Sequence, residues 1–304
     1  MALWGGLGVV TKCAAKLHHW PGPAVMPIEG VLPDTKLTEL PENIKVYLFT
    51  FSSIDKQTEF LYRLGKAEVG RFMYCTGYGA LVGAVPALHK YIPLNPGEKG
   101  VPDEVTTWLI LACNSRRETE YQEKVLNTVV AETEAKVPDF WDEPTVRATI
   151  FRYLIRPDYV FNYMYGFSGG GWIYWGDFIG AVDAVAALHK RLNEAAKPWE
   201  GKGLLPRCTD ATFQPMYDYS HAGYLDGSGS YWDPTDSETF RDNRHMVSNI
   251  TEALADATRP TINVKQYNEK GGPVLSNYHV WQKKIKRVFD PNYVSDASYY
   301  MDPE

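Results

Sequence analysis

Residues 278–300 read YHVWQKKIKRVFDPNYVSDASYY, and the fold is best argued outward from this stretch. Apolar side chains recur in it at helical spacing, which predicts an amphipathic helix whose single apolar stripe consists of Tyr278, Trp281, Ile285, Val288 and Phe289. The polar face is expected to carry basic side chains near the negative end of the helix dipole: Lys283, Lys284, Lys286 and Arg287. Asp290-Pro291-Asn292 is expected to end the helix, because proline cannot continue it and asparagine tolerates a turn.

The composition limits the class of protein. With 304 residues and 44% apolar residues, the chain can form one large domain or two ordinary ones. No apolar run approaches the length of a membrane span, and the N-terminus lacks the basic and apolar regions of a signal peptide. The net charge is −6 and no block of like charge stands out, which argues against nucleic-acid or anionic-membrane partners.

The cysteines and aromatic residues give two further indications. The four cysteines lie far apart without a C-x-x-C pair, which favours buried, reduced thiols in a cytoplasmic protein over disulfides or a metal site: Cys13, Cys75, Cys113 and Cys208. Aromatic residues make up 13% of the chain. They fit either a large core or subunit interface, or an aromatic-lined pocket for a planar ligand.

The N-terminal segment begins with a glycine-rich turn. Residues 5–12 read GGLGVVTK, and alternation continues to Leu17, which predicts a strand whose glycines allow close backbone approach to another group.

These two ends together resemble the FAD-linked oxidoreductases of the vanillyl-alcohol oxidase/p-cresol methylhydroxylase superfamily. A C-terminal helix ending in Lys-x-x-Phe-Asp-Pro-Asn, as at residues 286–292, is similar to the helix that returns to the flavin domain in that family. Residues 5–12 resemble the strand that closes its FAD-binding domain. The resemblance implies FAD as cofactor, with contacts from Gly6, Gly8, Val9, Val10 and Asn292.

In the resembled family a long flavin-binding portion with its own glycine-rich loop precedes this strand. Here the strand begins at Met1, so the flavin-binding portion is expected on a partner chain in a hetero-oligomer, or is absent. The expected organisation is a closing strand of an FAD-binding domain, a proline-rich linker, a cap or substrate domain, and a returning C-terminal helix and tail, at residues 1–20, 21–42, 43–274 and 275–304.

The central region predicts an α+β fold. Three strands, each followed by a helix, are expected at residues 44–51 and 55–64, 105–112 and 116–135, and 171–176 and 178–196. Ser52-Ser53 and Asn114-Ser115 are expected to cap the first two helices. Together with further strands they predict an antiparallel sheet with flanking helices on one face. The first two units look like a loose duplication of a ferredoxin-like half, which agrees with the cap domain of the resembled family. Residues 72–89 are expected to form a small-residue helix or buried turn, and residues 238–258 a helix.

Residues 209–232 contain the candidate chemistry. Two strands are expected around a turn at Asp226-Gly227, which is a strong hairpin signal. His221 would lie near the sheet edge, which makes it the histidine best placed for proton transfer. Histidine suits this role because the ordinary pKa of its side chain lies near neutrality. Hydroxyl groups of Tyr217, Tyr219 and Tyr224 can bind substrate oxygen atoms. The alternative is an ordinary hairpin whose polar residues face solvent.

The resemblance extends to this stretch. Residues 220–227, SHAGYLDG, are similar to the Ser-His-x-Tyr-x-x-Gly strand of the alkylglycerone-phosphate-synthase branch. In the glycolate/D-lactate branch, two histidines of the corresponding motif can hold a metal ion. This chain has His221 but no second histidine at that place in the motif, so no metal site is expected. Tyr267 and Asn268 occupy the position where glycolate-oxidase-like relatives carry Glu-His-Gly-x-Gly near the flavin ring.

The resulting hypothesis is a subunit or C-terminal part of an FAD-dependent oxidoreductase. It would form the pocket for hydride transfer from a small-molecule substrate (an alcohol, hydroxy acid or phenol) to flavin. The candidate catalytic residues are His221, Tyr219 and Tyr267, and the candidate substrate-binding residues are Tyr217, Tyr224 and Asn268. One alternative is a non-catalytic α+β scaffold subunit of a flavoenzyme complex, and another is a standalone binding protein for an aromatic ligand.

Overall fold

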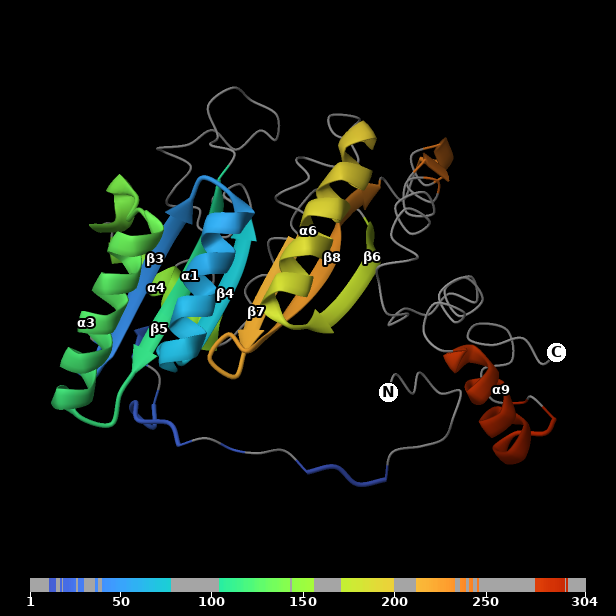
Figure 1. Ribbon diagram of the computed structural model, residues 1–304, viewed down its shortest axis with the longest axis horizontal. Coiled ribbons are helices and arrows are strands. Elements are labelled where there is room, and N and C mark those ends of the chain that lie inside the picture. The colour runs from blue at the N-terminus through green and yellow to red at the C-terminus, as the bar shows by residue number, and fades with distance from the viewer. Residues whose placement is uncertain are drawn as a thin grey trace.

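The computed structural model of this chain describes residues 11–14, 17, 19–25, 27–29, 36–37, 40–77, 104–142, 144–155, 171–199, 212–232, 236–238, 241–242, 245, 277–292 and 294. They form an α+β fold around one antiparallel six-stranded sheet (Figure 1), as predicted. The strands lie in the order β3-β5-β4-β7-β8-β6. Their bounds are β3 Ile44–Phe51, β4 Phe72–Gly77, β5 Val105–Ala112, β6 Gly171–Gly180, β7 Thr212–Tyr217 and β8 Ala222–Trp232.

Five α-helices are described, with bounds α1 Ile54–Ala67, α3 Arg116–Thr133, α4 Pro144–Ile155, α6 Val182–Ala196 and α9 Tyr278–Phe289. Two short 3-10 helices, η2 and η3, cover Asp139–Asp142 and Lys197–Trp199. In the segment predicted as a linker, β1 Ile28–Glu29 pairs antiparallel with β2 Lys36–Leu37.

The sheet consists of two halves with the same order of elements. The first half runs β3-α1-β4-β5 and the second β6-α6-β7-β8. The strand order is mirrored about the β4–β7 pair, so each half places its first strand at the outer edge and its second strand at the centre. The helices α1 and α6 pack against each other on one face (Figure 1). The order of elements is therefore duplicated, but the two copies are residues 44–112 and 171–232. The sequence had suggested that the copies were the first two strand–helix units, at residues 44–64 and 105–135.

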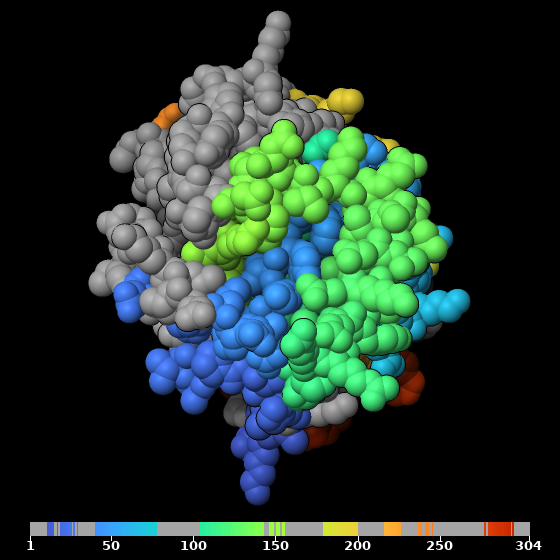
Figure 2. Space-filling view, turned by 90° about the vertical axis from the view of Figure 1, so that its left-hand side faces the viewer, coloured from blue at the N-terminus to red at the C-terminus, as the bar shows by residue number. Residues whose placement is uncertain are grey.

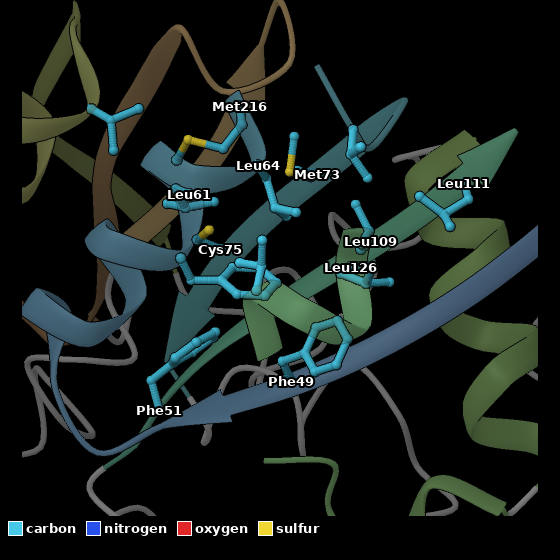
Figure 3. Packing of buried hydrophobic residues seen from close by; sticks show 14 of the residues in the cluster. Phe49, Phe51, Leu61, Leu64, Met73, Cys75, Leu109, Leu111, Leu126 and Met216 are labelled. Carbon is cyan, nitrogen blue, oxygen red and sulfur yellow. The ribbon is translucent and has the colours of Figure 1, made fainter. Parts of the chain in front are cut away.

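Helices cover both faces of the first half, which corrects the expectation of one covered face. Every residue of β5 is buried. Alternate residues of β3 and β5 face one core shared with α4, which contains Leu48, Trp108, Ile150 and Phe151. The other residues face a second core under α1 and α3 (Figure 3), whose members include Phe49, Phe51, Leu61, Leu64, Leu109 and Leu126. In a space-filling view the edge strand β3 lies between the α3 and α4 layers (Figure 2).

Serine caps set the helix starts in the first half. The Ser53 hydroxyl accepts a hydrogen bond from the backbone N–H of Lys56 at 3.3 Å, and the Ser115 hydroxyl accepts one from Glu118 at 3.2 Å. Both caps match the sequence prediction, because a serine oxygen satisfies a backbone donor that has no partner within the helix. In the second half, β6 continues to Gly180 and α6 begins at Val182, four residues later than predicted.

Three expectations about local structure were wrong. Residues 72–77 form the central strand β4, not a helix or buried turn, because hydrogen bonds from β5 and β7 hold them extended. Asp226-Gly227 lies inside β8, where pairing with both β6 and β7 overrides its turn tendency. Residues 11–14 are exposed and lie outside any strand; an alternating pattern forms a strand only where another strand pairs with it, and none of the described strands does so here.

The C-terminal helix α9 ends where predicted, but it exposes the face that was expected to be buried. It ends at Phe289, two residues before Pro291, and lies to the side of the sheet (Figure 1). Phe289 is 75% exposed and Trp281 63% exposed, whereas Lys286 is fully buried and forms an ion pair with Asp290 at 3.0 Å. The expected apolar stripe therefore faces outward in this chain, and Lys286 is not on a solvated face.

Candidate functional site

The β7–β8 turn, residues 218–221, contains the predicted residues Tyr219 and His221, and its backbone conformation is unusual. Asp218, Tyr219 and Ser220 have φ angles of 49°, 55° and 69°, so three successive residues with side chains adopt the left-handed conformation. The backbone N–H of His221 closes the turn by donating to the Asp218 carbonyl at 3.1 Å. Each such residue costs about 1–3 kcal/mol and persists only where surrounding contacts hold it in place.

Neighbouring elements supply those contacts. Ser220 is buried and its hydroxyl donates to the Met73 sulfur at 3.1 Å. On α1, a Cβ atom at Gly65 would lie 2.9 Å from the Tyr219 carbonyl oxygen, so the turn requires a glycine there. The Arg71 guanidinium donates to the Tyr219 hydroxyl at 3.1 Å. The turn is thus clamped by β4, α1 and the residue that precedes β4.

A chain of polar side chains continues from Arg71 along this end of the sheet. Arg71 also donates to the backbone carbonyl of His19 at 3.3 Å. The His19 ring lies 3.1 Å from the side-chain oxygen of Asn114, which follows β5. Asn114 in turn donates to Glu118 through its backbone N–H at 2.8 Å and its side-chain amide at 3.2 Å. Residues from four separate segments therefore meet beside the turn.

The structure brings together three of the residues predicted from the sequence. Tyr217, Tyr219 and His221 all belong to the β7–β8 turn or its first flanking residue. His221 is exposed, Tyr219 is half-buried, and burial of part of Tyr217 raises its pKa above the ordinary tyrosine value. Tyr224 is half-buried within β8, opposite Ile179 of β6.

The remaining predicted residues are not brought to this site. Asn292 is exposed in the turn after α9, which Figure 1 places away from the β7–β8 turn. The other predicted residues lie outside the described part of the chain: Gly6, Gly8, Val9, Val10, Tyr267 and Asn268.

Sequence reasoning missed Arg71, His19 and Asn114. A partial signal was available for Arg71, because an arginine directly before a buried strand places its charge at a sheet end. Nothing local could have paired it with Tyr219, which is far away in the sequence and reaches it through the β4–β7 pairing.

Other titratable groups are placed for structure and not for chemistry. Burial raises the pKa of the Cys75 thiol to about 12 and also raises that of Cys113, so neither is a ready thiolate. Burial lowers the pKa of His189 on α6 to about 3, so this ring is neutral near pH 7. Burial and a hydrogen bond to Glu123 raise the pKa of Tyr47 well above its usual range.

Two further observations concern metal and ligand binding in the described residues. Within the described ranges, no three histidine, cysteine, aspartate or glutamate side chains are grouped closely enough to hold a metal ion. An open depression lies along α3, but it is lined by one helix and does not enclose a ligand: Glu120, Glu123, Lys124, Asn127, Thr128, Ala131 and Glu132. Among the described helices, none has the length and apolar character needed to cross a membrane.

Comparisons with known proteins support the fold. The sequence matches no protein-family profile and no curated protein. Among solved structures, the chain is similar to 4-ethylphenol oxidase from Gulosibacter chungangensis, in an isoeugenol complex, with a TM-score of 0.59, 11% identity and 86% of this chain covered. The chain spans 55% of the length of that oxidase. At this identity the likeness defines an α+β fold shared with part of a known oxidase.

Two weaker likenesses were also found. An alkyldihydroxyacetonephosphate synthase has a TM-score of 0.44, with 10% identity and coverage of 83% of this chain and 44% of the synthase. A VAO-type flavoprotein from Myceliophthora thermophila C1 has a TM-score of 0.41, with 10% identity and coverage of 83% of this chain and 46% of that protein. Both scores are too low to support a conclusion about this chain.

Proposed function

We propose that this chain forms the substrate-binding part of an FAD-dependent oxidoreductase that oxidises an alcohol, a hydroxy acid or a phenolic compound. The observation that carries the proposal is the fold, which is similar to that of 4-ethylphenol oxidase over 86% of this chain. The N- and C-terminal sequence motifs, which resemble the same superfamily, support it independently of the fold.

Most of the flavin contacts would come from a separate flavin-binding portion, on a partner chain or in a longer form of this protein. Of the residues expected to contact FAD, Asn292 is the described one, and its exposed amide offers two N–H donors and one carbonyl acceptor. One amide cannot hold a dinucleotide. The 55% coverage of the similar oxidase is consistent with a chain that supplies one part of a larger enzyme.

When bound, the flavin would supply the hydride acceptor, and the residues of this chain would position substrate and move protons. His221 is exposed at the end of the constrained turn, where its ring can accept a proton from a substrate hydroxyl group. Tyr219, held by Arg71, can orient a substrate oxygen. Tyr217 and Tyr224 would line the approach, and Tyr267 and Asn268 would complete the site.

The alternative function is a non-catalytic scaffold subunit of a flavoenzyme complex. Its support is the lack, in the described residues, of a glycine-rich loop that could cradle a dinucleotide, together with the partial coverage of the similar oxidase.

A spectrum of the purified protein separates these two functions. The chain would be purified alone and after co-expression with a candidate flavin-binding chain from a neighbouring reading frame. Flavin absorbance in the co-purified sample that is bleached anaerobically by substrate supports the enzyme. Flavin that no alcohol, hydroxy acid or phenol reduces supports the scaffold, and flavin in neither sample argues against both.

His221 can then be tested within the active complex. His221→Ala is expected to slow flavin reduction by about 10²–10⁴-fold, the usual contribution of a general acid or base. His245→Ala removes another exposed histidine and should leave the rate unchanged. Equal rates for the two variants with flavin retained would exclude His221 from the reaction.

A further inference from the structure

Arg71 differs from Arg63 and Arg116 in what its guanidinium binds. Arg63 and Arg116 each form an ion pair with a carboxylate. Arg71 is half-buried, and no carboxylate of the described residues lies within ion-pair distance of it. Its two hydrogen bonds go to neutral oxygens, namely the Tyr219 hydroxyl and the His19 carbonyl. A guanidinium has more N–H donors than these two bonds use, so Arg71 keeps spare donors and, among the described residues, has no ion-pair partner.

The Tyr219 hydroxyl adds one further hydrogen-bond donor beside Arg71. Because the Tyr219 hydroxyl accepts its hydrogen bond from Arg71, its own proton remains available for another acceptor. Asn114 donates its amide to Glu118, so its side-chain oxygen accepts from the Nδ1–H of His19, whose ring is exposed. The carboxylate of Glu118 is held by two bonds from Asn114 and does not reach Arg71.

The position of the arginine is fixed before any ligand arrives. Its backbone N–H donates to the Ile110 carbonyl of β5 at 2.9 Å, and the aromatic ring that follows it, Phe72, packs edge-on against Trp20 at 6.0 Å. The left-handed turn fixes Tyr219 on the other side. A pre-arranged planar fork beside a hydroxyl donor matches the geometry of a carboxylate, which an arginine binds through two parallel hydrogen bonds.

We propose that Arg71 and Tyr219 bind the carboxylate group of the substrate. This inference rests on the proposed function and narrows its substrate class from an alcohol, a hydroxy acid or a phenolic compound to a hydroxy acid. The proposed base, His221, lies two residues after Tyr219 in the same turn. The aromatic content of the chain makes an aromatic hydroxy acid the first probe to use.

The test is calorimetric binding of mandelate to the full chain, with mandelamide as the neutral analogue and inorganic phosphate as a rival anion. Mandelate is expected to bind more tightly than either. Arg71→Gln should weaken mandelate binding by about tenfold to a hundredfold, because a charge-assisted bidentate contact is lost. The matched control, Arg117→Gln, removes the same charge from an exposed position in the first turn of α3 and should bind mandelate as the unmodified chain does.

Two further variants keep the test decisive if Arg71→Gln fails to fold. Arg71→Lys keeps the charge but loses the fork, and Tyr219→Phe keeps the ring but loses the donor; each should weaken mandelate binding and leave mandelamide unchanged. Thermal melting identifies any unfolded variant. Absence of mandelate binding, equal binding of mandelamide, or equal loss in the Arg117 control would overturn the inference, and phosphate bound as tightly as mandelate would overturn the substrate class.

The two proposals fail in different ways. The binding experiment needs no flavin. If mandelate binding depends on Arg71 but the protein never acquires flavin, the carboxylate site is supported and the proposed oxidoreductase function is rejected. If neutral alcohols reduce the flavin of the complex as fast as hydroxy acids do, the oxidoreductase function is supported and the carboxylate site is rejected.

Discussion

The two halves of the sheet contain the same order of elements but connect their inner strands differently. In the second half, β7 and β8 are joined by the tight turn at residues 218–221, whereas β4 and β5 of the first half are joined through residues 78–104. The first half is covered by helices on both faces and its strand β5 is buried throughout. The tight turn of the second half instead packs against the end of the first and gathers Tyr219, Arg71 and His19 there.

This difference indicates a division of roles. The duplicated order builds a continuous sheet, because β4 of one half pairs with β7 of the other. Burial in the first half stabilises that sheet, and the exposed turn of the second half carries polar groups that need access to solvent or ligand. Four experiments test the comparison, from the largest expected effect to the smallest.

The core of the first half should dominate stability. Phe60 of α1 is fully buried, with ring centroids 5.2 Å from Phe49 and 5.1 Å from Phe51. Phe60→Ala is expected to lower the free energy of unfolding by about 3–5 kcal/mol, because it leaves a cavity. Urea denaturation measures it. Ile179→Ala removes a 52% exposed side chain from β6 and should cost less than about 0.5 kcal/mol; equal losses would refute the division.

The second half should make stability depend on pH. Burial depresses the pKa of His189 from 6.5 to about 3 in the folded chain, so only the unfolded chain takes up this proton as the pH falls below 6.5. Stability is therefore unaffected by His189 above this range and decreases by about 1.4 kcal/mol per pH unit between 6.5 and 3.

Urea denaturation between about pH 5 and pH 8 measures this dependence, and His189→Leu should remove its share of the slope. The buried polar residue on α1 is Gln57, which donates to the Thr106 carbonyl at 2.9 Å and does not titrate. Gln57→Leu should therefore keep the slope of the unmodified chain. A slope unchanged in His189→Leu would show that the ring is not buried as described.

Backbone strain in the β7–β8 turn should be relieved by glycine. Asp218 is exposed with φ 49°, so Asp218→Gly is expected to stabilise the chain by about 0.5–1 kcal/mol in thermal or urea unfolding. In the first half, Gly70→Ala should have the opposite sign, since φ is 99° and the new Cβ would lie 2.6 Å from a methyl group of Leu109. A destabilised Asp218→Gly variant would mean that the aspartate side chain itself holds the turn.

The smallest effect concerns the ion pair between the halves. Lys190 of α6 pairs with Asp55 of α1, and their side chains are 42% and 76% exposed. A double-mutant cycle with Lys190→Gln and Asp55→Asn is expected to give a coupling energy of about 0.2–1 kcal/mol that decreases with added salt. Coupling well above this range would indicate that charge, and not packing of α1 on α6, joins the halves.

The sequence by itself determined the local elements whose signals lie within a few residues. Strands at residues 44–51 and 105–112 were predicted with their observed bounds, because buried runs of β-branched and aromatic residues are followed at once by serine caps. The caps Ser53 and Ser115 and the end of α9 before Pro291 were equally local. The α+β class followed from these elements.

Only the tertiary structure decided register, covered faces and the polar cluster. Pairing on both sides placed Asp226-Gly227 inside a strand and moved the turn to residues 218–221, although the dipeptide alone favours a turn. Lys286 is buried and Phe289 is exposed, which is the reverse of what the pattern of α9 predicts. Arg71 and Tyr219 meet through the β4–β7 pairing. Periodicity and capping act between near neighbours in the chain, whereas these features depend on contacts between distant segments, which no local pattern records.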